Sequence, residues 1–124
     1  MLLLDTNAIL RYVLQDNPEM ADVVEEQMSN EVCYVPVEVV AEVVYVLQKT
    51  YKIERNIITQ TLIDLTEMQH ICFFQDRVVY LALDVYTSTT FDFVDCLLIG
   101  YSKEKQYSIF TFDKKLQKYL HNTK

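Results

Sequence analysis

Short apolar runs alternate along the chain with longer segments in which apolar residues recur every three or four positions. The first run, residues 2–5, ends in an acid, and such short runs are typical of buried strands. Strands that alternate with helices predict a parallel sheet covered by helices. The predicted strands are residues 2–5, 32–35, 71–74 and 108–111, and the predicted helices are residues 7–15, 18–29, 36–50, 54–68, 76–86, 92–105 and 113–121.

The segment from Pro36 to Thr50 leaves two interpretations open. It is rich in β-branched valines, which favour a strand. Its length favours a helix, because strands rarely exceed ten residues. The start of another helix is clearer, since Asn17 suits an N-cap and Pro18 suits the first helical turn.

The amino-acid composition excludes several classes of functional site. For 124 residues we expect one domain, spanning residues 1–124. Gly100 is the only glycine, which excludes the glycine-rich phosphate loops, the G-x-S-x-G nucleophile elbow and the EF-hand. Two histidines and the absence of C-x-x-C argue against zinc motifs. No apolar run is long enough to cross a membrane, and the N-terminus does not suit a signal peptide.

Charge and cysteine usage add two expectations. Three cysteines, Cys33, Cys72 and Cys96, are set in apolar runs and suit a reduced, cytoplasmic protein. The formal net charge is −7, but its distribution is uneven. Residues 1–48 carry nine acids and one base, whereas residues 101–124 carry two acids and six bases. The basic end is either a solvated surface or a patch that steers phosphate groups.

Four acids stand out by their positions. Asp5 closes the first predicted strand, and Asp113 follows the last one, where parallel sheets bind ligands. Glu42 and Asp95 lie within strongly apolar helical segments, where a charge is costly unless it is paired or binds a metal. Few bases are nearby to pair with them, so the acids predict a metal site. Carboxylate oxygens are hard donors and suit Mg²⁺ or Mn²⁺ rather than zinc.

Four segments in this order resemble a known family: LLDTN at 3–7, AEV at 41–43, DFVDCLLI at 92–99 and IFTFD at 109–113. They resemble the PIN domain family, and most closely the VapC-type toxins of toxin–antitoxin pairs. The resemblance covers nearly the whole chain. It implies an α/β fold with three layers, α/β/α, around a central parallel sheet of four or five short strands.

The resemblance also implies an activity. The chain would be a Mg²⁺- or Mn²⁺-dependent endoribonuclease whose core ligands are Asp5, Glu42 and Asp95. Asp113 would be a fourth acid with a more variable role. Its expected partners are an RNA substrate, a small antitoxin and a second copy of the chain. Residues expected to hold the ligands or water are Thr6, Asn7 and Thr111.

For each of three further residues, two interpretations remain open. Asp92 suits a helix N-cap or an auxiliary metal role. Glu38 suits the positive end of a helix dipole or a ligand role. Arg11 either pairs with a local acid or holds a phosphate.

Two other functions compete with the nuclease hypothesis. A non-catalytic PIN-like interaction module would be favoured by loss of a core acid, but all three are present. A receiver-like domain needs an acidic pair after its first strand, where this chain has Asp5 alone. An aspartate-based phosphatase needs a second aspartate two residues later, where this chain has Asn7.

Overall fold

The computed structural model describes residues 1–122 and divides the chain into two compact units. Unit 1 spans Met1–Asp76, and unit 2 spans Arg77–Lys124. The strands belong to unit 1, and the described part of unit 2 is helical. No helix of the described residues is long and apolar enough to cross a membrane.

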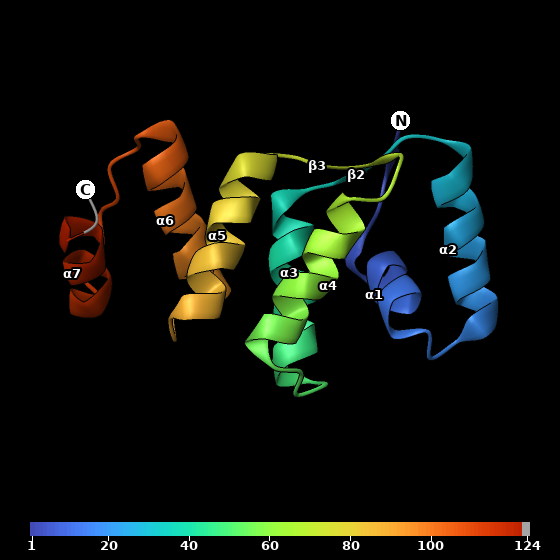
Figure 1. Ribbon diagram of the computed structural model, residues 1–124, viewed down its shortest axis with the longest axis horizontal. Coiled ribbons are helices and arrows are strands. Elements are labelled where there is room, and N and C mark those ends of the chain that lie inside the picture. Colours follow the sequence, from blue (N-terminus) through green and yellow to red (C-terminus); the bar gives the residue numbers. More distant parts are fainter. Residues whose placement is uncertain (123–124) are drawn as a thin grey trace. The chain divides into compact units, whose positions relative to one another are not determined.

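Unit 1 is built on a parallel sheet in the order β1-β2-β3. Leu2 is in register with Cys33, which is in register with Ile71. Helix α1 packs against α2 and α3, and α4 packs against α3 and β3 (Figure 1). The elements are β1 (Leu2–Leu3), α1 (Thr6–Leu14), α2 (Pro18–Asn30), β2 (Cys33–Val35), α3 (Val37–Lys49), α4 (Arg55–Thr66) and β3 (Ile71–Phe73).

The valine-rich segment forms the helix α3, so the strand interpretation was wrong. Its buried residues, Val40, Val43, Val44 and Leu47, are spaced three or four apart and so share one helix face. Burial of that face outweighs the modest helix propensity of valine. Helix α2 begins as expected, with the Asn17 side chain accepting a hydrogen bond from the Met20 amide at 3.1 Å.

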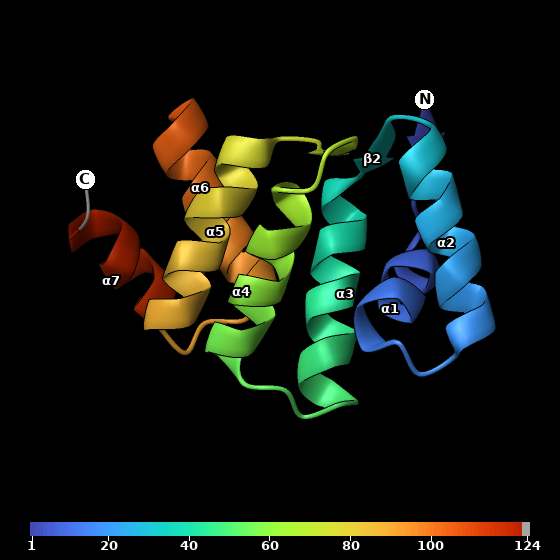
Figure 2. The same ribbon diagram turned by 45° about the vertical axis from the view of Figure 1, so that its right-hand side comes forward.

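Helix α5 (Asp76–Ser88) begins at the last residue of unit 1 and continues in unit 2, which also contains α6 (Phe93–Lys105) and α7 (Lys114–Asn122). Helices α5 and α6 lie side by side in both ribbon views (Figures 1 and 2). Gly100 allows their close approach, since a Cβ atom there would lie 2.7 Å from the Val78 carbonyl oxygen. The rings of Tyr86 and Phe93 meet edge to face, with centroids 5.6 Å apart.

The prediction of four or five strands was wrong, because the described residues contain three. The predicted strand 108–111 lies between α6 and α7, forms no regular secondary structure and pairs with no strand. Its own unit offers only helices, whose backbone groups are already hydrogen-bonded internally. The segment instead links two helix termini: Gln106 ends α6 in the left-handed conformation, and Asp113 caps α7.

Left-handed backbone is adopted by non-glycine residues at five described positions. Gln15 and Gln106 use it to end α1 and α6, at φ of 54° and 59°. Glycine is the usual residue at such positions, and this chain has only one. Cys33, Cys72 and Cys96 are all free thiols, as predicted.

Candidate active site

Asp5 joins β1 to α1 and is the N-cap of that helix. Its Oδ1 accepts a hydrogen bond from the Ala8 amide at 2.8 Å, which satisfies one of the free N–H groups of the first turn. The side chain is exposed, and within the described residues Oδ2 has no hydrogen-bond partner. Thr6 and Asn7 follow directly in the first turn of α1. Asp5 can therefore cap the helix and still offer an oxygen to a ligand.

Glu42 lies on the exposed side of α3, opposite the face that Val40, Val43 and Val44 bury. Glu38 is one turn earlier on the same exposed side, in the first turn of the helix. The expectation that Glu42 carries a costly charge among apolar side chains was therefore wrong. Its apolar neighbours in sequence point to the other face, because successive helical residues are 100° apart.

Asp95 is half-buried in the first turn of α6 and differs electrostatically from the other candidate acids. Burial raises its pKa above the ordinary value, and the nearby charges of Asp113 and then Asp92 raise it further. Two neighbouring carboxylates of unit 2 thus disfavour the ionised form of Asp95. Asp92 occupies the N-cap position of α6, as one interpretation expected, but its side chain makes no capping hydrogen bond.

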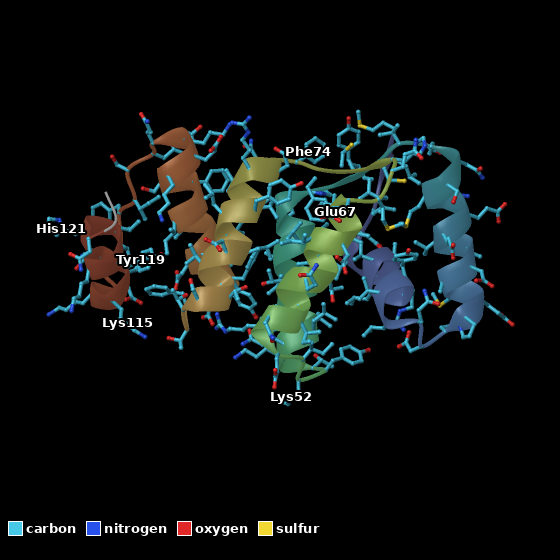
Figure 3. The ribbon with its side chains drawn as sticks, viewed as in Figure 1. Lys52, Glu67, Phe74, Lys115, Tyr119 and His121 are labelled. Atoms are coloured by element: carbon cyan, nitrogen blue, oxygen red, sulfur yellow. The ribbon has the colours of Figure 1, made fainter. Side chains whose placement is uncertain are left out.

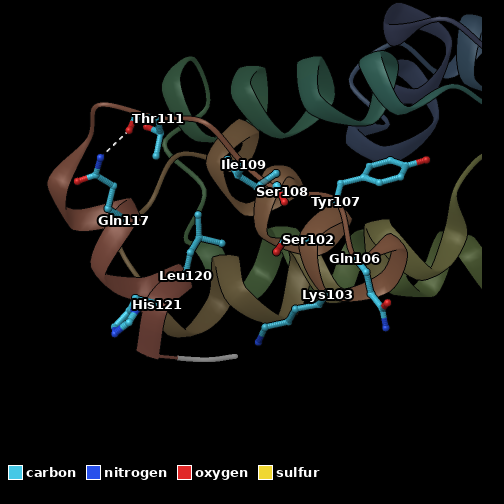
Figure 4. A pocket seen from close by; sticks show the side chains of 10 residues that line it. All are labelled: Ser102, Lys103, Gln106, Tyr107, Ser108, Ile109, Thr111, Gln117, Leu120 and His121. Carbon is cyan, nitrogen blue, oxygen red and sulfur yellow. Dashed lines mark hydrogen bonds between the residues drawn. The ribbon is translucent and has the colours of Figure 1, made fainter.

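Asp113 is fixed at the start of α7 by two short hydrogen bonds. Its Oδ1 accepts from the Leu116 amide at 3.0 Å, and its own amide donates to Thr111 Oγ1 at 3.0 Å. The Thr111 carbonyl oxygen accepts from Gln117 Nε2 at 2.6 Å (Figure 4). Thr111 therefore contacts the backbone of Asp113, and its role beside a metal ligand stays a prediction.

No ion pair neutralises the four candidate acids within residues 1–122. Arg11 pairs with Asp16, at 3.0 Å between Nη1 and Oδ2, which confirms its pairing with a local acid. Glu31 pairs with the N-terminal amine, and Glu104 with Arg77. The N-terminal amine, Arg11 and Arg77 are thus paired with acids other than the four candidates.

The candidate ligands divide between the units, with Asp5 and Glu42 in unit 1 and Asp95 and Asp113 in unit 2. Within either unit, the described residues include no group of three or more His, Cys, Asp or Glu side chains that could hold a metal ion. The donors nevertheless fit a hard divalent cation, since all four offer carboxylate oxygens and none is ion-paired.

Comparison with known proteins decides the family. The sequence model of the PIN domain matches residues 2–121, which include all four candidate acids. The chain belongs to the PIN domain family. No curated protein and no solved structure matches it. PIN domains are typically nucleases that act on RNA, and they usually bind Mg²⁺ or Mn²⁺.

Sequence analysis missed that two acids of this PIN domain are also helix caps. Asp5 and Asp113 each accept a hydrogen bond from the amide three residues later. The signal was available, because an aspartate directly before a helical segment is a typical N-cap. Asp5 was interpreted as the end of a strand and Asp113 as the first residue of a helix that follows a strand, and neither was interpreted as a cap.

Proposed function

We propose that this PIN domain is a Mg²⁺- or Mn²⁺-dependent endoribonuclease that hydrolyses RNA phosphodiesters. The observation that carries the proposal is the set of four unpaired carboxylates, Asp5, Glu42, Asp95 and Asp113, in a chain of this family. Burial and two neighbouring carboxylates raise the pKa of Asp95 and so disfavour its ionised form, and a bound cation would offset that cost.

The residues of the chain would prepare the site in different ways. The Ala8 amide orients the Asp5 carboxylate, and the Leu116 amide orients that of Asp113. Asp95 is the acid most in need of a positive charge, because burial and two neighbouring carboxylates disfavour its ionised form. A bound divalent ion supplies an acidified water and offsets charge that develops on the phosphate.

The finer proposal is a VapC-type toxin, cytoplasmic, acting as a homodimer and held inactive by a small antitoxin. Its support is the resemblance of residues 3–7, 41–43, 92–99 and 109–113 together with the surface of unit 1. Unit 1 exposes apolar side chains such as Val23 and Ile57, and its residues 1–48 carry nine acids and one base. Such a surface suits a partner with a basic and apolar tail.

The test is cleavage of a structured RNA by purified protein with Mn²⁺, with Mg²⁺ and with chelator alone. We expect cleavage only with metal, and a loss of at least about 100-fold in Asp5→Asn and Asp95→Asn, the scale seen when one electrostatic group is removed from a site. The matched control is Asp84→Asn, which removes an exposed acid of α5. Expression of the parent, but not of Asp95→Asn, should also arrest growth.

Two results would contradict the proposal. Undiminished cleavage in chelator would exclude a metal mechanism. Equal loss of activity in Asp84→Asn and Asp95→Asn would show that loss of any acidic charge disturbs the protein. The assignment of the four candidate acids as metal ligands would then have no support.

A further inference from the structure

A cavity between α1 and α4 is not used by the proposed metal site. Its volume is about 480 Å³, within the range of small-molecule sites, which is roughly 300–1,000 Å³. The residues that line it come from the end of α1, the C-terminal half of α4 and the turn that follows, so unit 1 alone forms it. The two sides meet where the Tyr12 hydroxyl donates a hydrogen bond to Met68 Sδ at 3.5 Å.

The cavity lies at the negative ends of two helices. The last carbonyl oxygens of a helix carry a partial negative charge, which favours a nearby cation. Asp64 adds a full negative charge in the last turn of α4, and Glu67 follows at the C-cap of that helix (Figure 3). Arg11, in the last turn of α1, is paired with Asp16. No Lys, Arg or His is found among the described residues that line the cavity, so its charge favours a cationic ligand.

The two hydroxyl groups of the cavity have already donated their protons. Tyr12 donates to Met68 Sδ, and Thr61 Oγ1 donates to the Ile57 carbonyl oxygen at 2.8 Å. A hydroxyl group has one proton and two acceptor lone pairs. Towards a ligand, both hydroxyl oxygens can therefore act as acceptors.

The other two polar side chains of the cavity also offer acceptors. Gln15 Nε2 donates to the Tyr12 carbonyl oxygen at 2.6 Å, and Gln15 Oε1 accepts no hydrogen bond from the described residues. Asp64 Oδ1 accepts from Gln60 Nε2 at 2.8 Å, and Oδ2 has no partner within the described part of the chain. A ligand that matches this lining has to supply hydrogen-bond donors.

The remaining lining residues are apolar and argue against a metal ion as the ligand. They are Val13, Leu65 and Met68. A hard divalent cation needs several oxygen ligands or bound waters, whereas Asp64 is the only carboxylate among the described lining residues. An apolar chain that carries a positive group fits both parts of the cavity.

We propose that this α1–α4 cavity binds a free aliphatic amine, a small molecule with an ammonium group on an apolar chain. An ammonium group has three N–H donors and no acceptor, which matches the oxygens of Asp64, Gln15 and Tyr12. Its hydrogen bond to the Asp64 carboxylate is charge-assisted and therefore stronger than one between neutral groups. The volume of the cavity suits a whole small molecule better than a single side chain of a partner protein.

The inference is independent of the proposed ribonuclease function, and its test measures binding alone. Pentylammonium chloride is titrated into the isotope-labelled full chain in chelator at constant ionic strength, and amide shifts are followed by NMR. We expect saturable shifts that centre on the lining residues. Asp64→Asn keeps the acceptor for Gln60 but loses the charge, so it should bind about tenfold more weakly. Tyr12→Phe, which loses the hydroxyl oxygen, should bind about threefold more weakly.

The matched controls separate the cavity from the general attraction of a chain whose net charge is −7 for any cation. Asp22→Asn removes an exposed acid of α2 that does not line the cavity, and it should bind pentylammonium as the parent does. Ammonium chloride lacks the apolar chain and pentanol lacks the charge, so each should bind much more weakly than pentylammonium. All variants should keep the circular dichroism of the parent.

Several outcomes would overturn the amine site. Equal binding by Asp64→Asn and the parent would do so, as would shifts that do not saturate or that ammonium chloride reproduces. Tighter binding of a blocked lysine peptide than of pentylammonium would show that the cavity receives a side chain of another protein instead. None of these measurements involves RNA cleavage, so failure of the amine site leaves the proposed ribonuclease function to its own test.

Discussion

Replacement of Asp5 separates the folding role of this residue from its proposed role in metal binding. The carboxylate caps α1 through the Ala8 amide at 2.8 Å, and its second oxygen is free of partners among the described residues. Asparagine keeps an oxygen acceptor of the same size but has no charge. Alanine removes both the acceptor and the charge. We expect Asp5→Asn to lose cleavage with an intact fold, and Asp5→Ala to lose cleavage and stability together.

The loss of stability expected in Asp5→Ala follows from the capping hydrogen bond. Replacement of an Asp, Asn, Ser or Thr N-cap by alanine lowers the free energy of unfolding by about 1 kcal/mol, within a range of roughly 0.5–2. For a chain of this size that corresponds to roughly 4 °C in melting temperature. Asparagine caps as well as aspartate. Asp5→Asn should therefore lose only the attraction between an exposed charge and the helix dipole, which contributes about 0.5 kcal/mol to the free energy of unfolding.

The assay is thermal unfolding in chelator, followed by circular dichroism, combined with metal-dependent RNA cleavage. Asn17→Ala is the matched control, because Asn17 caps α2 through the Met20 amide at 3.1 Å and is not a candidate ligand. It should melt about as far below the parent as Asp5→Ala does, and cleave RNA as the parent does. Added Mn²⁺ should raise the melting temperature of the parent and of Asn17→Ala, but much less that of Asp5→Asn.

Two results would refute the reasoning. If Asp5→Asn melts as low as Asp5→Ala, the charge itself supports the fold and the capping argument is wrong. If Asp5→Asn cleaves RNA at the rate of the parent, the carboxylate is not a metal ligand.

Two further predictions concern unit 2. The pKa of Asp95 is raised above 3.8 by burial and by the charges of Asp113 and Asp92. The native state therefore binds the proton of this carboxyl more tightly than the unfolded state does, and the protein loses stability as the pH rises through the raised pKa. Asp95→Asn should therefore melt above the parent at neutral pH, with a difference that shrinks in acid; parallel curves would contradict this. Gly100→Ala should lower the free energy of unfolding by about 1–3 kcal/mol, because the added Cβ would lie 2.7 Å from the Val78 carbonyl oxygen. A denaturant titration measures this loss, and an unchanged midpoint would contradict the close approach of the two helices.

The helices and the first three strands could be predicted from local pattern alone. Apolar spacing placed α1, α4 and α6 within a few residues, and Asn17 with Pro18 marked the start of α2. These signals are local, because a helix needs only its own backbone partners and an amphipathic face. The end of α5 was predicted less accurately, since the helix continues to Ser88 rather than ending at residue 86.

The segment 108–111 could not be settled in this way. Its composition is that of a strand, but a strand exists only where another backbone pairs with it, and pairing is not encoded locally. The exposure of Glu42 could not be predicted from its local sequence either. Its sequence neighbours are apolar, and only the register of α3 shows that it faces solvent. Sequence alone also gave no position for the left-handed helix ends, which glutamine occupies at Gln15 and Gln106.

Stability does not account for the residue types at the candidate site. At Asp5 and Asp113 the capping hydrogen bond requires an oxygen acceptor but not a charge, so asparagine or serine would also cap these helices. At Asp95 the carboxylate opposes the fold, because burial and two like charges disfavour its ionised form. At Glu42 the side chain is exposed and unpaired, so the fold does not require an acid there. The fold therefore leaves the acidic residue types at these four positions unexplained, whereas the proposed divalent cation would explain them, because its chemistry favours negative oxygen donors.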